Sequence, residues 1–233
     1  MRISILLSIL LSFFAVGFRF GGLPIVSAPT VQQNDANIEF DWAFGVLGYD
    51  GKTPVPIPLT RDTVLKSGNE IKMMVKITKE CYVYALYLDS QGNLSLLFPY
   101  SIPQFQADYV VAKQYYIPKG RNWMVLDKNT GKETFFLIGS TERLLDLEAK
   151  LGNLFSADPA DRKPLAQDVV SEIRGLRRRY STFATLAEKP LSIGGNIRSI
   201  DTVKVAGRID VADITTHISA NNFYSKTITI DHQ

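Results

Sequence analysis

Apolar and polar residues alternate one by one over several stretches of this 233-residue chain, and this constrains its fold more than any other feature. The first stretch has apolar side chains at every second position: Ile38, Phe40, Trp42, Phe44 and Val46. A second runs from Ile71 to Ile77. Side chains two residues apart lie on the same face of a strand, so each stretch predicts a strand with one buried face.

Residues 81–88 are apolar on both faces, which predicts a central strand. The turn at 89–92 leads into residues 94–98, the expected hairpin partner. Residues 123–126 and 134–138 flank a turn at 129–131 and predict a second hairpin. The three prolines of 54–58 limit that segment to an edge strand or an extended loop. Further strand candidates are 109–112, 115–118, 202–205, 209–214 and 226–230.

Two helices are expected after Gly139, where the apolar spacing changes from two to that of a helix. The first has an apolar stripe from Leu144 to Phe155, with Ser140 or Thr141 as its cap. The second has its stripe from Leu165 to Tyr180. Strand patterns then resume, so residues 141–189 are predicted as a helical insertion in one β-rich domain of residues 38–233. The predicted fold is mainly β, an antiparallel β-sandwich-like domain with a two-helix insertion.

The N-terminus has the pattern of an export signal. Arg2 precedes the almost wholly apolar run Ile3–Val16, which is short for a bilayer span. We expect residues 1–28 to be a signal peptide, cut after Ala28 or Gly17, or an N-terminal membrane anchor if neither site is cut. Residues 29–37 are expected to form a linker. The protein is therefore predicted to be exported to the periplasm or cell envelope, and to contact a membrane only through an uncleaved N-terminus.

Composition argues against several classes of function. Without residues 1–28 the chain has 24 basic and 23 acidic residues, so its net charge gives no reason to expect a nucleic-acid partner. The single cysteine, Cys81, precludes an intramolecular disulfide. His217 and His232 are the only histidines, which argues against a His-rich metal site and leaves carboxylate-only cation sites open. We expect no cofactor and no metal.

Several pieces together resemble a bacterial family known only as domain-of-unknown-function family 4384. They are Leu65–Asn69, Tyr82–Gly92, Leu96–Pro99, Tyr116–Pro118 and Phe136–Ser140. The resemblance covers roughly Gly48 to Ser140. It implies an all-β module of exported or envelope-associated proteins. The family has no established catalytic motif, so the resemblance transfers no catalytic residue.

Two sets of residues could carry chemistry, and each also has a structural interpretation. Cys81 could act as a nucleophile with His217 or His232, but its apolar strand favours a buried structural thiol. The second set could pair carboxylates for glycoside hydrolysis, although such acids are also common in turns: Asp89, Asp127, Glu133 and Asp146.

Two surface features could bind a partner. The second helix has four arginines that fit an anionic partner or, more simply, a solvated face: Arg174, Arg177, Arg178 and Arg179. The aromatic loop has Tyr100, Phe105 and Tyr109, which either meet a partner or fold back into the core. The expected function is a non-enzymatic binding or accessory module for a protein or envelope polymer. The alternative is a hydrolase that acts on envelope peptide or glycan.

Overall fold

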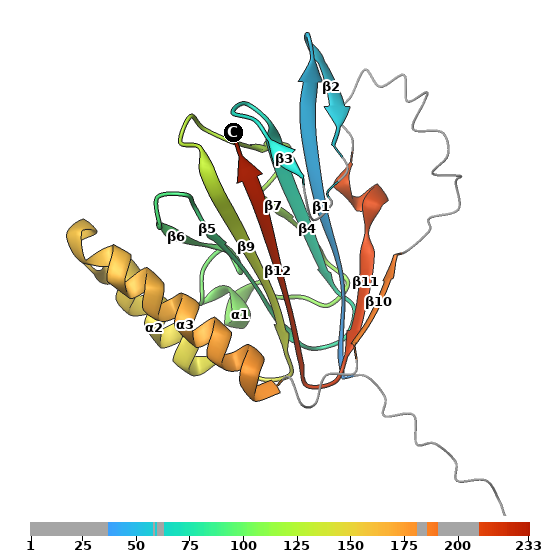
Figure 1. The fold of residues 1–233 in the computed structure, drawn as a ribbon. Coiled ribbons are helices and arrows are strands. Elements are labelled where there is room, and N and C mark those ends of the chain that lie inside the picture. The colour runs from blue at the N-terminus through green and yellow to red at the C-terminus, as the bar shows by residue number, and fades with distance from the viewer. Residues whose placement is uncertain (1–36, 58, 60–62, 181–185, 191–209) are drawn as a thin grey trace, which may run out of the picture. The chain divides into compact units, whose positions relative to one another are not determined.

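The computed structural model describes residues 37–57, 59, 63–180, 186–190 and 210–233, the fourth range by its backbone alone. All its elements belong to one compact unit, Asn34–Gln233. The first sheet, sheet A, has the strand order β10-β11-β1-β4-β7, with β2 paired to β1 and β8 paired to β4 (Figure 1). Its strands are β1 (Ile38–Asp50), β2 (Thr53–Pro56), β4 (Glu70–Ile77), β7 (Gln114–Ile117), β8 (Met124–Val125), β10 (Leu186–Pro190) and β11 (Thr216–Ala220).

The second sheet, sheet B, has the order β3-β12-β9-β5-β6. Its strands are β3 (Val64–Leu65), β5 (Tyr82–Leu88), β6 (Leu94–Phe98), β9 (Gly131–Ser140) and β12 (Phe223–His232). The short β3 pairs parallel to β12, and the other pairs are antiparallel. The last strand of the chain therefore lies inside this sheet, against β9 along its whole length.

The main core fills the space between the two sheets. The alternating apolar residues of β1 pack there against Phe135 and Leu137 of β9 and Tyr224 of β12. Gly139 allows the sheets to approach closely, because a Cβ at that position would lie 2.8 Å from Cε1 of Phe40. A residue that faces this inter-sheet space is thus normally apolar and buried.

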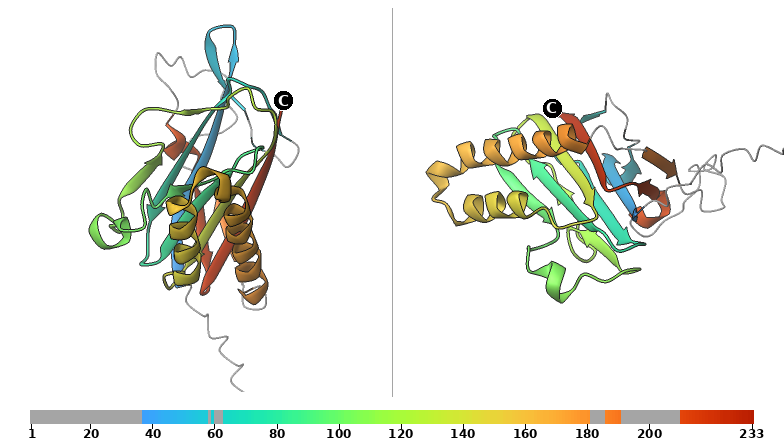
Figure 2. Two further views of the ribbon diagram at one scale, coloured as in Figure 1. Left: turned by 90° about the vertical axis from the view of Figure 1, so that its left-hand side faces the viewer. Right: turned by 90° about the horizontal axis from the view of Figure 1, so that it is seen from below.

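Helices α2 (Leu145–Ser156) and α3 (Arg162–Tyr180) cover the other face of sheet B, with the 3-10 turn η1 (Pro159–Asp161) between them (Figure 2). Their apolar stripes pack on Tyr84 and Leu86 of β5 and Phe136 and Ile138 of β9. Sheet B is therefore buried on both faces, which explains why residues 81–88 are apolar at every position. The predicted fold class is confirmed: two mainly antiparallel sheets with two packed helices.

A third, smaller apolar cluster covers the outer face of sheet A. Val211 of the 3-10 helix η3 (Val211–Ile214) and Trp123 pack over Ala43, Leu47 and Met74.

Among the described residues, no helix has the length and apolar character needed to span a membrane.

Several local predictions differ from the structure. Residues 123–126 and 134–138 do not form a hairpin, because β8 pairs with β4 in sheet A whereas β9 belongs to sheet B. Residues 109–112 form no strand. Residues 211–214 form the 3-10 helix η3, in which Asp210 caps the N–H of Ala212.

Two further differences concern the ends of the helical segment. Helix α2 begins at Leu145 without a side-chain cap, so neither Ser140 nor Thr141 caps it. Strand β10 begins at Leu186, inside the range predicted as the helical insertion. The strand expected at 202–205 and the N-terminal segment 1–28 lie outside the described residues.

Candidate functional site

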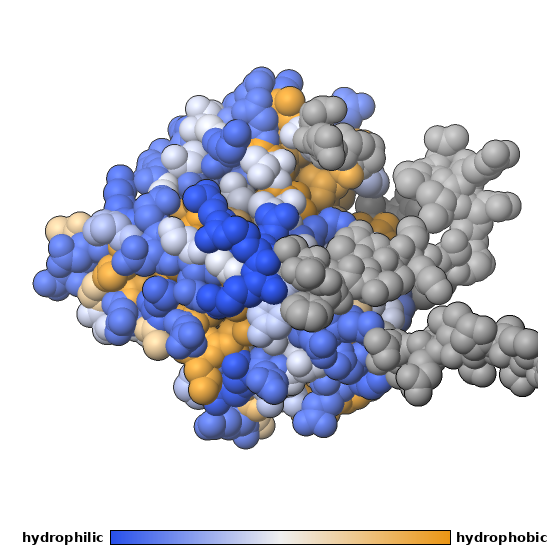
Figure 3. All heavy atoms as spheres, turned by 60° about the horizontal axis from the view of Figure 1, so that its bottom comes forward, coloured by the Kyte–Doolittle hydropathy of each residue, from blue (hydrophilic) through white to orange (hydrophobic). Residues whose placement is uncertain are grey.

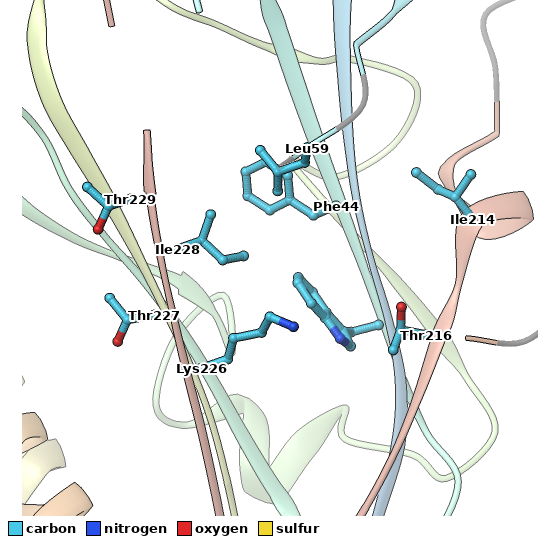
Figure 4. Close-up of a pocket in the computed structure, with 9 residues that line it drawn as sticks. Phe44, Leu59, Ile214, Thr216, Lys226, Thr227, Ile228 and Thr229 are labelled. Carbon is cyan, nitrogen blue, oxygen red and sulfur yellow. The ribbon is translucent and has the colours of Figure 1, made fainter. Parts of the chain in front are cut away.

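A pocket of about 510 Å³ opens between the two sheets (Figure 4). Its described lining comes from β1, β11 and β12, the 3-10 helix η3 and one residue of the β2–β3 connection: Trp42, Phe44, Leu59, Ile214, Thr216 and Lys226–Thr229. Lys226 and Ile228 point from β12 into the pocket, whereas Thr227 and Thr229 lie on the opposite side of that strand. Its volume lies within the range of ordinary small-molecule sites.

Lys226 is the charged residue of this pocket, and the alternation of β12 explains its place. Tyr224, Ile228 and Ile230 face the inter-sheet core, and Lys226 shares their parity. Its ammonium lies 5.3 Å from the centroid of the Trp42 ring. A cation at this distance is attracted to the face of an indole. None of the described lining residues is acidic, and Lys226 makes a further interaction within the chain besides its contact with Trp42.

Trp42 contributes a further polar group to the pocket, beside those of Lys226 and Thr216. The residue is only 5% exposed, and its indole Nε1 is buried without a hydrogen-bond partner in the structure. The neighbouring ammonium cannot satisfy this N–H, because both groups are donors only. A buried donor without an acceptor costs about 1–3 kcal/mol. A ligand acceptor that bonded Nε1 would remove this cost, and its binding would be more favourable as a result.

A hydrogen-bonded chain of Ser67, His232 and Glu133 lies elsewhere, at the end of β12. The Nε2 atom of His232 is 3.1 Å from the Ser67 hydroxyl, and its Nδ1 is 3.3 Å from Oε1 of Glu133. The Tyr87 hydroxyl donates to the other Glu133 oxygen at 2.7 Å. His232 and Glu133 are buried, whereas Ser67 is exposed. This is the order of groups found in nucleophile–base–orienter sites.

The backbone amides beside Ser67 do not form an oxyanion hole, which a nucleophilic serine would also need. The Ser67 N–H donates to the Gln233 carbonyl at 3.2 Å, and the Gly68 N–H donates to the Leu126 carbonyl at 2.8 Å. These amides are therefore already bonded and do not point at a place where an oxyanion could develop.

Cys81 does not form a hydrogen bond with either histidine. Its sulfur lies 3.8 Å from the Glu39 carbonyl oxygen, and His217 bonds Asp41 at 2.8 Å. The side chain is 1% exposed, and burial raises the pKa of the thiol from 9.0 to about 12. The thiol thus stays protonated at neutral pH, which agrees with the structural interpretation.

The four acids do not gather in one site. Asp89 accepts hydrogen bonds from the backbone of Gln91 and Asn93, and Asp127 accepts one from Asn129, as turn residues do. Asp146 is exposed in the first turn of α2. Glu133 alone is buried, in the chain with His232. The described residues contain no cluster of three or more potential metal ligands of the His, Cys, Asp and Glu types.

The loop with Tyr100, Phe105 and Tyr109 folds back on the sheets. All three side chains are half-buried, and the loop contains the short helix α1 (Gln104–Ala107). The Tyr109 hydroxyl donates to the Cys81 carbonyl at 2.9 Å, and the Tyr100 hydroxyl donates to the Tyr116 carbonyl at 2.7 Å. The geometry therefore favours the core interpretation of these rings over the contact-surface interpretation.

The arginines of α3 are exposed, and Arg177, Arg178 and Arg179 all interact with groups of this chain. Arg179 pairs with Glu172 at 2.8 Å, and Arg177 donates to the Thr227 hydroxyl at 3.3 Å. The space-filling view in Figure 3 shows a mainly hydrophilic face with small separate apolar areas. These contacts favour the interpretation of a solvated helix face.

Three residues of these two sites were not singled out in the sequence analysis. Ser67 appeared only within the family motif Leu65–Asn69, and no local pattern shows that it lies beside a residue 165 positions away. Trp42 was assigned to a buried face without its unsatisfied N–H. Lys226 had a readable signal, because it occupies a position that the alternation of β12 assigns to the core.

Comparison with known proteins identifies one part of the chain. Residues 64–143 match the family described as Domain of unknown function (DUF4384). Searches of curated proteins and of solved structures gave no match. The described pocket residues all lie outside the matched range, on segments that precede and follow it. The chain thus carries a DUF4384 domain at residues 64–143, and β1, β11 and β12 from the flanking sequence complete its two sheets.

Proposed function

We propose that this protein is an exported, non-enzymatic binding module of the bacterial cell envelope whose ligand enters the pocket between the sheets. The observation that carries the proposal is the buried Trp42 N–H without an acceptor beside the Lys226 ammonium. Binding sites typically combine apolar walls with a few placed polar groups, and this pocket has that composition. The partner, a protein or an envelope polymer, would present part of itself to the pocket.

Ligand occupancy can be tested on protein purified from the envelope of its native host. Thr216→Phe should fill part of the pocket, and Thr130→Phe in an exposed turn serves as the matched control. Mass spectrometry of protease digests and of organic extracts should find a partner protein, a polymer fragment or another molecule that accompanies the wild type and the control and is lost from Thr216→Phe. The same accompanying molecules in all three folded proteins would contradict the proposal.

Export is supported by the apolar run that follows Arg2. A reporter that is active only outside the cytoplasm should work when fused after Gln233. If this fusion is silent while a cytoplasmic reporter at the same position is active, the proposed location is wrong.

A serine hydrolase is the second candidate, favoured by the Ser67–His232–Glu133 chain. It ranks below binding because the amides of Ser67 and Gly68 already donate to carbonyl groups. A fluorophosphonate probe distinguishes the two, since it modifies only an activated serine. Labelling that is lost in Ser67→Ala and in His232→Ala would establish the hydrolase; an unlabelled, folded wild type excludes this serine as a nucleophile.

A further inference from the structure

We infer that the pocket takes the carboxylate end of an amphiphilic ligand, with an anionic oxygen between Lys226 and Trp42 and an apolar body against the apolar part of the lining. This inference rests on the proposed binding function and names the chemical class of its ligand. The carboxylate could belong to an acyl chain or to the C-terminus of an apolar peptide.

The first argument is that the Trp42 indole and the Lys226 ammonium, two of the polar groups that line this pocket, are both hydrogen-bond donors only. The Trp42 Nε1 lacks an acceptor, and the Lys226 ammonium lies over the same indole ring. An ammonium has three donor hydrogens and no acceptor, and an indole has one donor. A ligand oxygen could accept hydrogen bonds from both groups. The negative charge of a carboxylate would also be attracted to the positive charge of the ammonium.

The second argument concerns the rest of the lining. Phe44 and Ile228 belong to the apolar core between the sheets or pack against it, and Leu59 packs there as well. Ile214 is 51% exposed and lines the pocket as well. These apolar side chains beside two donors fit a molecule with an apolar body and one anionic end, and Thr216 of the lining adds a hydroxyl group to the site.

The Lys226 side chain can adjust its position around a ligand. Lys226 is half-buried, and its charge lies at the end of a flexible four-carbon stem. Such a stem can move its ammonium toward a ligand oxygen while the strand stays in place. The backbone on both sides is held in place, because Trp42 pairs with Val75 and Thr216, and Lys226 pairs with Leu137.

The experiment follows the indole N–H of Trp42 by NMR. The chain has two tryptophans, so a ¹⁵N-labelled sample gives two indole signals, and Trp123→Phe assigns them. The probes are decanoate and decanamide, and the acetylated dipeptide Phe-Leu as its free acid and as its C-terminal amide. Each pair differs only at the charged end, and the two pairs distinguish an acyl chain from a peptide terminus.

We expect at least one of the two acids to shift the Trp42 signal downfield in a saturable manner. Its neutral partner should bind about tenfold more weakly, because it lacks the charge-assisted bond to Lys226. Lys226→Gln should remove that difference by weakening the acid alone. Lys128→Gln, an exposed loop lysine, is the matched control and should change neither affinity. The dispersion of each spectrum reports whether the variant is folded.

Two results would overturn the inference. Equal affinity for an acid and its amide, unaffected by Lys226→Gln, would show that the pocket binds ligands without selecting an anion, and the proposed function would survive. If no probe shifts the Trp42 signal, carboxylates of these two kinds are excluded. The binding function then fails as well only if Thr216→Phe also leaves the accompanying molecules unchanged.

Discussion

At the scale of single residues, the Tyr84 hydroxyl joins sheet B to the first turn of α2. It donates to Oε1 of Glu148 at 2.7 Å and accepts the N–H of Leu144 at 3.0 Å. Arg143 pairs with the same carboxylate. A tertiary contact thus satisfies a backbone N–H at the helix start that a capping side chain would otherwise bond.

Tyr84→Phe tests this contact. The change should lower the free energy of unfolding by roughly 1–3 kcal/mol, because it leaves the Leu144 N–H buried without its acceptor. Urea unfolding provides the measurement. Tyr82→Phe on the same strand is the control, since the described structure gives its hydroxyl no hydrogen bond. Equal stability of the wild type and Tyr84→Phe would show that the contact contributes nothing.

Phe105 distinguishes the two interpretations of the aromatic loop. Its ring packs edge-on against Tyr84 and Tyr109, with centroids 5.1 and 4.9 Å apart. Because the side chain is only half-buried, Phe105→Ala should cost roughly 1–3 kcal/mol, below the value for a fully buried ring. Phe155→Ala at an exposed site of α2 should cost less. An unchanged melting temperature together with lost partner binding would restore the contact-surface hypothesis.

At the scale of elements, α2 and α3 depend on sheet B. Their buried residues, such as Leu151 and Ile173, pack on β5, β9 and β12 as well as on each other. An amphipathic helix pair gains most of its stability by burying its apolar stripe. The pair should therefore be unstable without the sheet.

A peptide of residues 141–189 tests this dependence. Circular dichroism should show little helix and no cooperative melting, because its apolar faces lack the sheet on which they pack. The intact protein, measured under the same conditions, is the reference. A stable helical fragment with a sharp thermal transition would instead identify a separate domain.

At the scale of the whole molecule, the buried acids of high pKa predict instability in alkali. Burial raises the pKa of Cys81 from 9.0 to about 12 and that of Tyr100 from 10.0 to about 12. It also raises the pKa of Tyr84, Tyr87 and Tyr109. These groups stay protonated in the folded chain at pH values where they ionise in the unfolded chain.

The stability that this protonation contributes is complete below the unfolded pKa values and is lost as pH rises toward the folded ones. The free energy of unfolding should thus fall between pH 9 and pH 12, as measured by urea titrations at several pH values. Cys81→Ala and Tyr109→Phe should each make the decline less steep. Parallel curves for the wild type and both variants would contradict this account.

Much of the fold could be predicted because the period of apolar residues is visible within each short segment of the sequence. The alternation in β1 and β4 shows which face is buried, the apolar run of β5 indicates burial on both faces, and the stripes of α2 and α3 show their helical period. The family domain was recognised from short motifs, although its match extends to Arg143 and begins at Val64. The position of Lys226 could also be inferred, because the alternation of β12 places this lysine on the face toward the core.

Strand partners and site geometry were decided only by the tertiary structure. The turn after β8 looks like a hairpin in sequence, but the chain crosses there from sheet A to sheet B. Ser67 meets His232, and Trp42 meets Lys226, because packing joins segments far apart along the chain. The sequence by itself determined which residues are apolar and therefore favour burial. Only the packed sheets decided which of them meet, because pairing depends on contacts between distant segments that no local period encodes.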